Sequence, residues 1–285
     1  GVQTDHVTAN GDHVFSGRKR SSLPEHLTMA SFLAEESARF LSEDRSEPFM
    51  LQVHFFEPHN PYTGPLNGLH DPESIPVGPA FMKQPEETSL FNRVRADFYS
   101  DKSGPHPKMG DFGEGTPEQK WRRLRAQYYS NVTLVDRAVG RILNALNESG
   151  KADETIVVFT SDHGEMAGDH GLLEKRAFYE ASAKVPLLLH VPWKDGQPRV
   201  IPGNMSHIDL VPTLLELMGE QVPAHLQGVS RVPVLNETEH LLENDVYVQW
   251  NGLGDRELQA PGANLLGAIP RRSIVTSEVA EDGSV

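Results

Sequence analysis

Two short polar clusters follow apolar runs of this sequence. His59 stands in a Pro-His-Asn-Pro string, whereas Asp162, His163 and Gly164 follow one another directly, with Lys175 further along the chain. Adjacent Asp and His offer an oxygen and a nitrogen ligand for a metal on a stiff element, although an Asp that caps a turn is the alternative. Taken alone, the histidine is more typical of a rigid surface loop than of a functional group. Each cluster is a weak signal by itself, so their meaning depends on whether the fold brings them together.

The apolar runs around these clusters are typical of buried strands. Residues 49–56 are apolar and bounded by prolines, residues 155–160 are rich in β-branched side chains, and residues 185–191 form a third such run. Strand patterns alternate with helical ones, so the sequence predicts an α/β fold with a largely parallel sheet. Ligands of such sheets bind at the carboxyl ends of the strands. We therefore expect the two clusters and Lys175 to converge at that edge.

Helical periodicity marks the elements between these strands. Small and apolar side chains recur at spacings of three and four over residues 28–41. A capping box that begins at Thr116 opens a long helix, which we expect to end at Gly150. A third helix is expected to run to Leu217, with Asp209 as its cap.

Composition excludes several classes of protein. The 285 residues carry 26 Lys and Arg against 40 Asp and Glu, a formal net charge of -14, which argues against nucleic acid as a general partner. No apolar run approaches the length of a membrane-spanning helix, so no membrane span is predicted. The lack of Cys excludes disulfides, thiolate zinc sites and a Cys nucleophile within these residues. Any nucleophile for hydrolysis is therefore another residue or lies elsewhere.

Read together, these motifs resemble the type I sulfatases of the alkaline phosphatase superfamily. The string FTSDHGEMAGDHG with the lysine behind it is the most specific part, and the Pro-His-Asn-Pro string looks like the histidine loop of that family. The resemblance extends roughly from Thr28 to Ile274 and is lost in the acidic tail. The segments that carry it are residues 55–65, 129–142, 159–171 with Lys175, 179–187 and 207–215.

The resemblance implies a role for each matching residue. Asp162 and His163 fall on the family's distal pair of metal ligands, around a calcium ion. Asp suits a hard cation such as calcium, whereas His is a less typical calcium ligand. His59 falls on the histidine that contacts the sulfate or the leaving oxygen, and Lys175 on the lysine that neutralises the sulfate. Hydrolysis of a sulfate ester needs these groups, because charge develops on the non-bridging oxygens and the departing alkoxide takes a proton.

The resemblance also implies an alkaline-phosphatase-like sandwich, a central sheet flanked by helices, that is incomplete at the N-terminus. The family's nucleophile is a formylglycine made from Cys or Ser in a Cys/Ser-x-Pro/Ala-x-Arg motif, and neither this motif nor the accompanying Asp-Asp metal pair is found in the chain. We therefore expect residues 1–240 to be a partial catalytic domain and residues 241–285 to start a small C-terminal subdomain with a frayed tail. The formylglycine is expected only upstream, so this chain alone should be inactive.

The implied function is that of a metal-dependent sulfuric ester hydrolase acting on a sulfated small molecule or glycan. Two alternatives stay open: a phosphonate or phosphate mono- or diesterase of the same superfamily, because the oxyanions are similar in shape, and a catalytically silent domain. The family suggests a periplasmic or secreted protein. Neither the particular sulfate ester nor the oligomeric state follows from the sequence.

Overall fold

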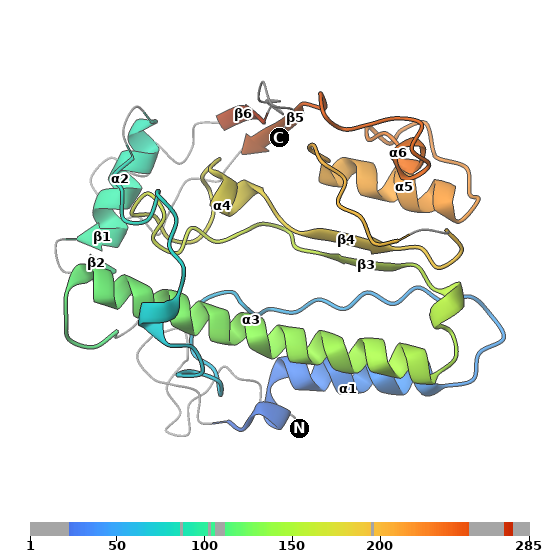
Figure 1. Ribbon diagram of the computed structural model, residues 1–285, viewed down its shortest axis with the longest axis horizontal. Coiled ribbons are helices and arrows are strands. Elements are labelled where there is room, and N and C mark those ends of the chain that lie inside the picture. Colours follow the sequence, from blue (N-terminus) through green and yellow to red (C-terminus); the bar gives the residue numbers. More distant parts are fainter. Residues whose placement is uncertain are drawn as a thin grey trace. The chain divides into compact units, whose positions relative to one another are not determined.

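The computed structural model describes residues 23–85, 88–101, 104–105, 112–194, 197–250 and 271–275. The chain divides into two compact units, one that reaches Lys194 and one that begins at Asp195 (Figure 1). The domain boundary predicted after residue 240 stays a prediction. The helices are α1 (Met29–Ser42), α2 (Leu90–Tyr99), α3 (Pro117–Glu148), α4 (Glu180–Ala183), α5 (Leu210–Leu217) and α6 (Val232–Leu235). The strands are β1 (Ser100–Asp101), β2 (Gly104–Pro105), β3 (Val157–Thr160), β4 (Leu187–His190), β5 (Val246–Trp250) and β6 (Arg271–Val275).

The long helix α3 and the shorter helix α1 lie side by side in the first unit (Figure 1). Their contact is a small apolar cluster of Ala30 and Ala34 from α1 with Leu134 and Ala138 from α3. All four side chains are at most 2% exposed. Because alanines are small, the two helix backbones approach closely along this stripe, as the helical period of residues 28–41 predicts.

Both of these helices begin where the sequence predicts, through local hydrogen bonds. The Thr116 hydroxyl accepts from the Gln119 backbone N–H at 3.2 Å, and the Gln119 side chain accepts from the Thr116 N–H at 2.9 Å. At α1, the Thr28 hydroxyl accepts from the Ser31 N–H at 3.2 Å. These caps satisfy donors that the first turn of a helix leaves without partners, so the prediction of the capping box is confirmed.

The strands that the structure describes pair antiparallel in each of three two-stranded ladders, which corrects the expectation of a largely parallel sheet for these strands. In the ladder of β3 and β4, Val157 lies opposite His190 and Thr160 lies opposite Leu187. The chain therefore leaves β3 and enters β4 at the same end. The Thr160 hydroxyl donates to the Pro186 carbonyl there at 2.9 Å. Residues 161–186, which include α4, connect the two strands at this one end and do not cross to the opposite end of the ladder, as antiparallel neighbours allow.

Residues 49–56, predicted as a buried strand, are extended but form no ladder with any strand that the structure describes. Alternate side chains face in opposite directions. Phe55 packs against the α1 and α3 cluster, and the Phe49 ring lies 5.6 Å from that of Phe40, whereas Met50 is 77% exposed. The segment is thus half-buried, with the period of two that an extended chain imposes. It leads from α1 to the loop that holds His59.

The second unit contains α5, α6 and the β5 and β6 ladder. The predicted helix after Asp209 is present, but the Asp209 carboxylate does not cap it. That carboxylate is buried and instead accepts from the Val229 N–H at 2.9 Å and from the Arg231 Nε at 2.8 Å. A guanidinium stabilises a buried carboxylate more than a helix end does, so the Asp209 side chain bonds to Arg231 rather than to the first turn of α5.

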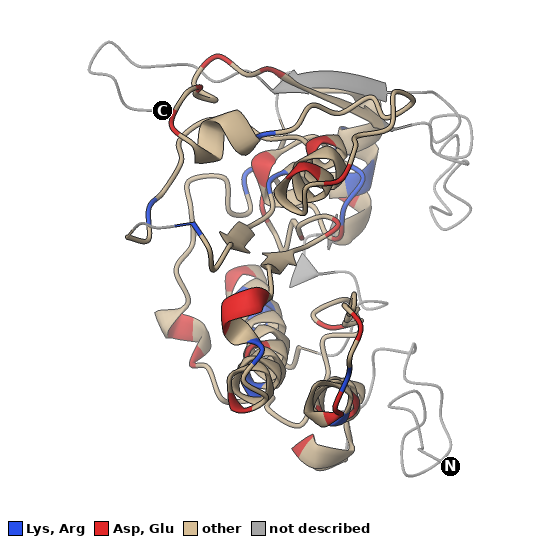
Figure 2. Cartoon of the chain, turned by 90° about the vertical axis from the view of Figure 1, so that its right-hand side faces the viewer, with Lys and Arg blue, Asp and Glu red and all other residues tan. Residues whose placement is uncertain are grey.

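Charged residues occur on most of the helices that the structure describes, with acidic and basic positions interspersed along α3 (Figure 2). Arg122 pairs with Glu118 one turn earlier at 2.8 Å, and Arg137 pairs with Glu25 at 2.6 Å. None of the described helices combines the length and the apolar character that a membrane span requires.

Candidate active site

His59 lies in the turn that follows the extended segment. Its backbone N–H donates to the Phe56 carbonyl at 3.1 Å, and its ring centroid lies 4.8 Å from that of Phe56. The ring Nδ1 lies 2.7 Å from the backbone carbonyl oxygen of Asn60. A carbonyl oxygen can only accept, so Nδ1 carries the proton when the ring is neutral. The other nitrogen, Nε2, then presents a lone pair.

Lys175 donates to that lone pair. Its Nζ lies 2.7 Å from His59 Nε2, although 116 positions separate the two residues. The residues on either side of the lysine have left-handed backbone, with φ of 63° at Glu174 and 75° at Arg176. This conformation costs a side chain larger than glycine about 1–3 kcal/mol and persists only where the surroundings hold it. The structure therefore brings His59 and Lys175 together in a locally strained loop.

The loop that leads to Lys175, residues 164–175, which we call the lysine loop, folds back on itself. The Met166 N–H donates to the Glu174 carbonyl at 2.9 Å. The Glu165 carboxylate accepts from the N–H groups of Glu174 and Ala167, the latter at 3.2 Å. Burial raises the pKa of Glu165, and the nearby Glu174 carboxylate adds to the rise. A buried carboxylate that accepts backbone N–H bonds stiffens the loop in front of Lys175.

Asp162 and His163 occupy the turn directly after β3. The Asp162 Oδ1 accepts from the His163 N–H at 2.9 Å and from the Ser161 hydroxyl at 3.3 Å. The His163 Nδ1 lies 2.8 Å from the Gly164 carbonyl oxygen, so its Nε2 also presents a lone pair when the ring is neutral. This Nε2 lies 3.5 Å from Asp162 Oδ2. One carboxylate oxygen of Asp162 therefore accepts hydrogen bonds within the turn, and the other faces the imidazole nitrogen of His163.

These two side chains fit a cation as part of its ligand set. Partial burial opposes the charge of Asp162, but His163 and the hydrogen bonds within the turn outweigh it and lower the pKa of the carboxyl. A carboxylate oxygen and an imidazole nitrogen whose orientation is fixed by a backbone carbonyl are common metal ligands. The described residues contain no cluster of three or more such side chains. Since calcium takes six to eight ligands, these two side chains alone do not amount to a calcium site.

The pair of His59 and Lys175 does not contact the pair of Asp162 and His163 directly. Residues 164–174 connect His163 to Lys175. Among the described residues, no hydrogen bond or ion pair links His59 or Lys175 to Asp162 or His163. The base of the loop is fixed at Gly164, whose N–H donates to the Ser182 carbonyl at 2.8 Å. A Cβ on this glycine would lie 2.2 Å from the backbone oxygen of Ala181, so only glycine fits.

Two further hydrogen bonds beside the site meet at Glu174, to which the motifs assign no role. The Asn60 side chain donates from Nδ2 to Glu174 Oε1 at 3.2 Å, and the Tyr99 hydroxyl donates to Glu174 Oε2 at 3.3 Å. Glu174 is 9% exposed, and Tyr99 is 6% exposed. The only hint in the sequence is position, since Asn60 follows His59 and Glu174 precedes Lys175.

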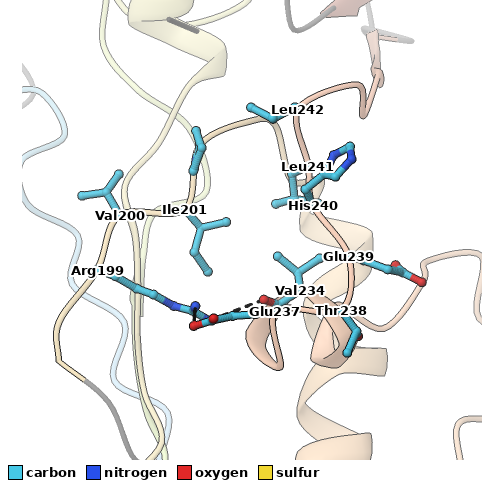
Figure 3. Close-up of a pocket in the computed structure, with 11 residues that line it drawn as sticks. Arg199, Val200, Ile201, Val234, Glu237, Thr238, Glu239, His240, Leu241 and Leu242 are labelled. Carbon is cyan, nitrogen blue, oxygen red and sulfur yellow. Dashed lines mark hydrogen bonds and ion pairs between the residues drawn. The ribbon is translucent and has the colours of Figure 1, made fainter. Parts of the chain in front are cut away.

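A separate pocket of about 350 Å³ lies in the second unit (Figure 3). Figure 3 shows Arg199 and Glu237 joined at one side of it by an ion pair. The predicted site residues do not line this pocket. Its lining residues are Arg199, Val200, Ile201, Pro202, Val234, Glu237, Thr238, Glu239, His240, Leu241 and Leu242.

The sequence matches known proteins over most of its length. Residues 5–220 match the family model described as Sulfatase. The multifunctional alkaline phosphatase superfamily protein PehA of Trinickia caryophylli is 30% identical over 243 residues, covering 80% of this chain and 45% of PehA. An arylsulfatase of Clostridium perfringens is 30% identical over 233 residues, covering 75% of this chain and 43% of the relative.

A solved structure agrees with these matches. The phosphonate monoester hydrolase of Agrobacterium radiobacter superposes with a TM-score of 0.71 at 27% identity, covering 95% of this chain and 55% of that one. This chain thus spans about half the length of the proteins that it matches. The family match covers three quarters of the residues, and the chain belongs to the sulfatase family of the alkaline phosphatase superfamily.

Proposed function

We propose that this chain carries part of the active site of a sulfuric ester hydrolase and binds the sulfate group beside His59 and Lys175. The observation that supports this most directly is the 2.7 Å contact between His59 Nε2 and Lys175 Nζ. Two loops far apart in the sequence present a cation and an imidazole at one point, each on a constrained turn. A cation beside an imidazole is the pair that an ester of a strong oxyanion needs for cleavage.

The proposed roles follow from the atoms of each side chain. Lys175 turns its N–H bonds toward the non-bridging oxygens of the sulfate, where negative charge increases in the transition state. His59, once protonated, donates from Nε2 to the oxygen of the departing alcohol. The Nδ1 hydrogen bond to the Asn60 carbonyl, 2.7 Å long, keeps the ring oriented with Nε2 toward the substrate.

Asp162 and His163 are the proposed ligands of one divalent cation, calcium by the family resemblance. Asp162 Oδ2 and His163 Nε2, 3.5 Å apart, would hold it. When bound, such an ion supplies positive charge that polarises the sulfuryl oxygens. The further ligands and the formylglycine nucleophile are proposed to lie outside this chain, consistent with its coverage of 45% of PehA and 43% of the clostridial arylsulfatase.

A second candidate function is hydrolysis of phosphonate or phosphate esters. It is favoured by the 27% identity and the TM-score of 0.71 to the phosphonate monoester hydrolase. The same lysine and histidine would serve either reaction, because both oxyanions are tetrahedral and charged. We favour sulfate esters of small molecules or glycans because the matching family model is that of sulfatases.

The test compares aryl sulfate and aryl phosphonate hydrolysis by this chain and by the same chain extended upstream to include the family's nucleophile motif. We expect activity only in the extended protein, with the sulfate ester cleaved faster. Faster phosphonate cleavage would select the second function. Absence of both activities in an extended, folded protein would reject the hydrolase assignment and favour a silent domain.

A further inference from the structure

The carboxylate of Glu174 is buried beside the candidate site, yet the proposed reaction does not use it. It is 9% exposed and accepts from Asn60 Nδ2 at 3.2 Å and from the Tyr99 hydroxyl at 3.3 Å. The fully buried guanidinium of Arg95 lies nearby and donates to the Leu173 carbonyl at 3.0 Å. A charged carboxylate is unfavourable in such a place unless its hydrogen bonds compensate for the lost water.

The two partners of Glu174 come from different parts of the chain. Asn60 belongs to the histidine loop, and Tyr99 is the last residue of α2. The bond to Asn60 spans 114 positions and runs beside the contact of His59 with Lys175, one residue away on each loop. Together with Tyr99, Glu174 and Asn60 form a group that we call the latch, in which Glu174 and Tyr99 are buried. The latch joins the histidine loop, α2 and the lysine loop.

The backbone at the latch contains left-handed residues, which persist only where surrounding contacts hold them. Glu174 has a φ of 63° and Arg176 a φ of 75°, so Lys175 is held between two left-handed residues. Ala167 and His170, in the same loop, also have positive φ, at 40° and 53°. Such strain gathers where the surroundings over-determine a loop, often at functional sites. Within the loop, the Glu174 backbone bonds to Met166 and to the Glu165 carboxylate, and the side-chain bonds of Glu174 add the contacts that reach the histidine loop and α2.

We propose that Glu174 is a positioning residue that, through Asn60 and Tyr99, holds Lys175 Nζ against His59 Nε2. The effect of Glu174 on catalysis rests on the proposed function. Its effect on the contact between Lys175 and His59 does not, because that contact exists without substrate. Loss of the carboxylate lets residues 174–176 relax from left-handed backbone. Lys175 then leaves His59, and the imidazole loses its partner at Nε2.

The alternative is that Glu174 only stabilises the fold. In that case its substitution lowers the melting temperature and leaves the His59 ring unchanged in the folded protein. The two explanations differ in a spectroscopic signature. With Lys175 at Nε2 and a carbonyl at Nδ1, the neutral ring is a single tautomer protonated at Nδ1. Without the lysine, Nε2 has no donor, and only the Nδ1 hydrogen bond to the Asn60 carbonyl still favours that tautomer.

The experiment records the ring nitrogens of His59 by long-range proton–nitrogen NMR in this chain, without substrate. We expect Glu174→Ala to shift the Nε2 signal to the position found in Lys175→Ala, and Glu174→Gln to keep the wild-type position because an amide can bond to both partners. Glu237→Ala is the matched control, since Glu237 also has a positive φ, 61°, and an ion-paired carboxylate, but lies in the second unit. It should leave the His59 signals unchanged.

A wild-type His59 spectrum in folded Glu174→Ala would overturn the proposal. If Glu174→Ala does not fold, Asn60→Ala decides, because it removes the link between the loops and leaves Glu174 in place. A shifted Nε2 signal in Asn60→Ala supports the latch, and an unshifted one rejects it. Because the spectra require no turnover, failure of sulfatase activity would reject the proposed function without deciding this test.

Discussion

Lys175 and His59 have different tasks in the proposed reaction, so their substitutions should differ in pattern. In the upstream-extended protein we expect Lys175→Ala to lower kcat/KM by about 10²-fold or more on every sulfate ester, because a preorganised charge that faces the developing oxyanion is lost. His59→Ala should impair an alkyl sulfate much more than an activated aryl sulfate, since only the alkoxide depends on a donated proton. Steady-state kinetics on both substrates measure the difference.

Equal losses on the two substrates for His59→Ala would remove the role as general acid and leave His59 as a binding residue. Unchanged activity in Lys175→Ala would end the assignment of that lysine. Lys184→Ala serves as the control, because Lys184 pairs with Glu180 on the exposed surface of α4 and should not affect turnover.

Tyr128 gives a prediction about alkaline pH. Burial, followed by the charge of Glu165, raises the pKa of Tyr128 from 10.0 to about 12. The fold thus favours the neutral phenol, and this stabilisation is complete below the pKa of the unfolded chain, about 10, and is lost as pH rises through about 12. Above pH 10, we expect the free energy of unfolding of Tyr128→Phe to decrease less with rising pH than that of the wild type. Chemical denaturation across that range measures both.

The matched control is Tyr247→Phe, because the Tyr247 side chain is 73% exposed in the second unit. It should reproduce the alkaline unfolding of the wild type. If Tyr128→Phe follows the same curve as the wild type, the phenol of Tyr128 ionises as readily in the folded protein as in the unfolded chain.

The sequence identifies some of these residues and misses others for a physical reason. His59 and Lys175 are found because their motifs resemble a family, and no spacing rule would pair residues 116 positions apart. The bond between Asn60 and Glu174 is not predictable, although Asn60 lies in the Pro-His-Asn-Pro string, because polar residues of a loop normally face solvent. Only the fold shows that Glu174 is 9% exposed and bonded to two distant side chains.

The N-terminus of α3 offers a test of local helix stability. Thr116→Ala removes the acceptor for the Gln119 N–H and should lower the free energy of unfolding by about 1 kcal/mol. Thr116→Ser keeps the acceptor and should lose little. Urea denaturation of the three proteins measures both effects, and equal stability of Thr116→Ala and the wild type would mean that water satisfies the helix end equally well.

The helices α1, α3 and α5 are predictable because their signals are local, whereas α2, α4, α6 and the strand pairing are not. The cap at Thr116 and the period of residues 28–41 depend on neighbours within four positions. The pairing of β3 with β4 depends on the path of residues 161–186, which no apolar pattern specifies. The apolar runs also predict burial on both faces, yet Leu188 in β4 is 64% exposed. A run of apolar residues does not reveal which layer will cover it.

We propose that the chain as a whole carries part of a site whose remaining residues lie in a longer protein. It covers 45% of PehA and 43% of the clostridial arylsulfatase, and both matches are 30% identical. Within the described part of the chain, the first unit holds the His59 and Lys175 pair as well as Asp162 and His163. Calcium binding therefore tests the proposal that only some of the metal ligands lie in this chain.

Calcium binding should be weak in the 285-residue chain and tight only in the upstream-extended protein. Asp162 and His163 would supply two ligands, and the described residues contain no cluster of three, whereas calcium needs six or more. Titration calorimetry should show no stoichiometric binding to this chain. In the extended protein, Asp162→Ala should abolish binding and metal-dependent turnover together, and Asp136→Ala, a loss of an exposed carboxylate on α3, should change neither. Tight one-to-one binding by the chain alone would mean that it already contains a complete cation site, and the proposed division of ligands would be wrong.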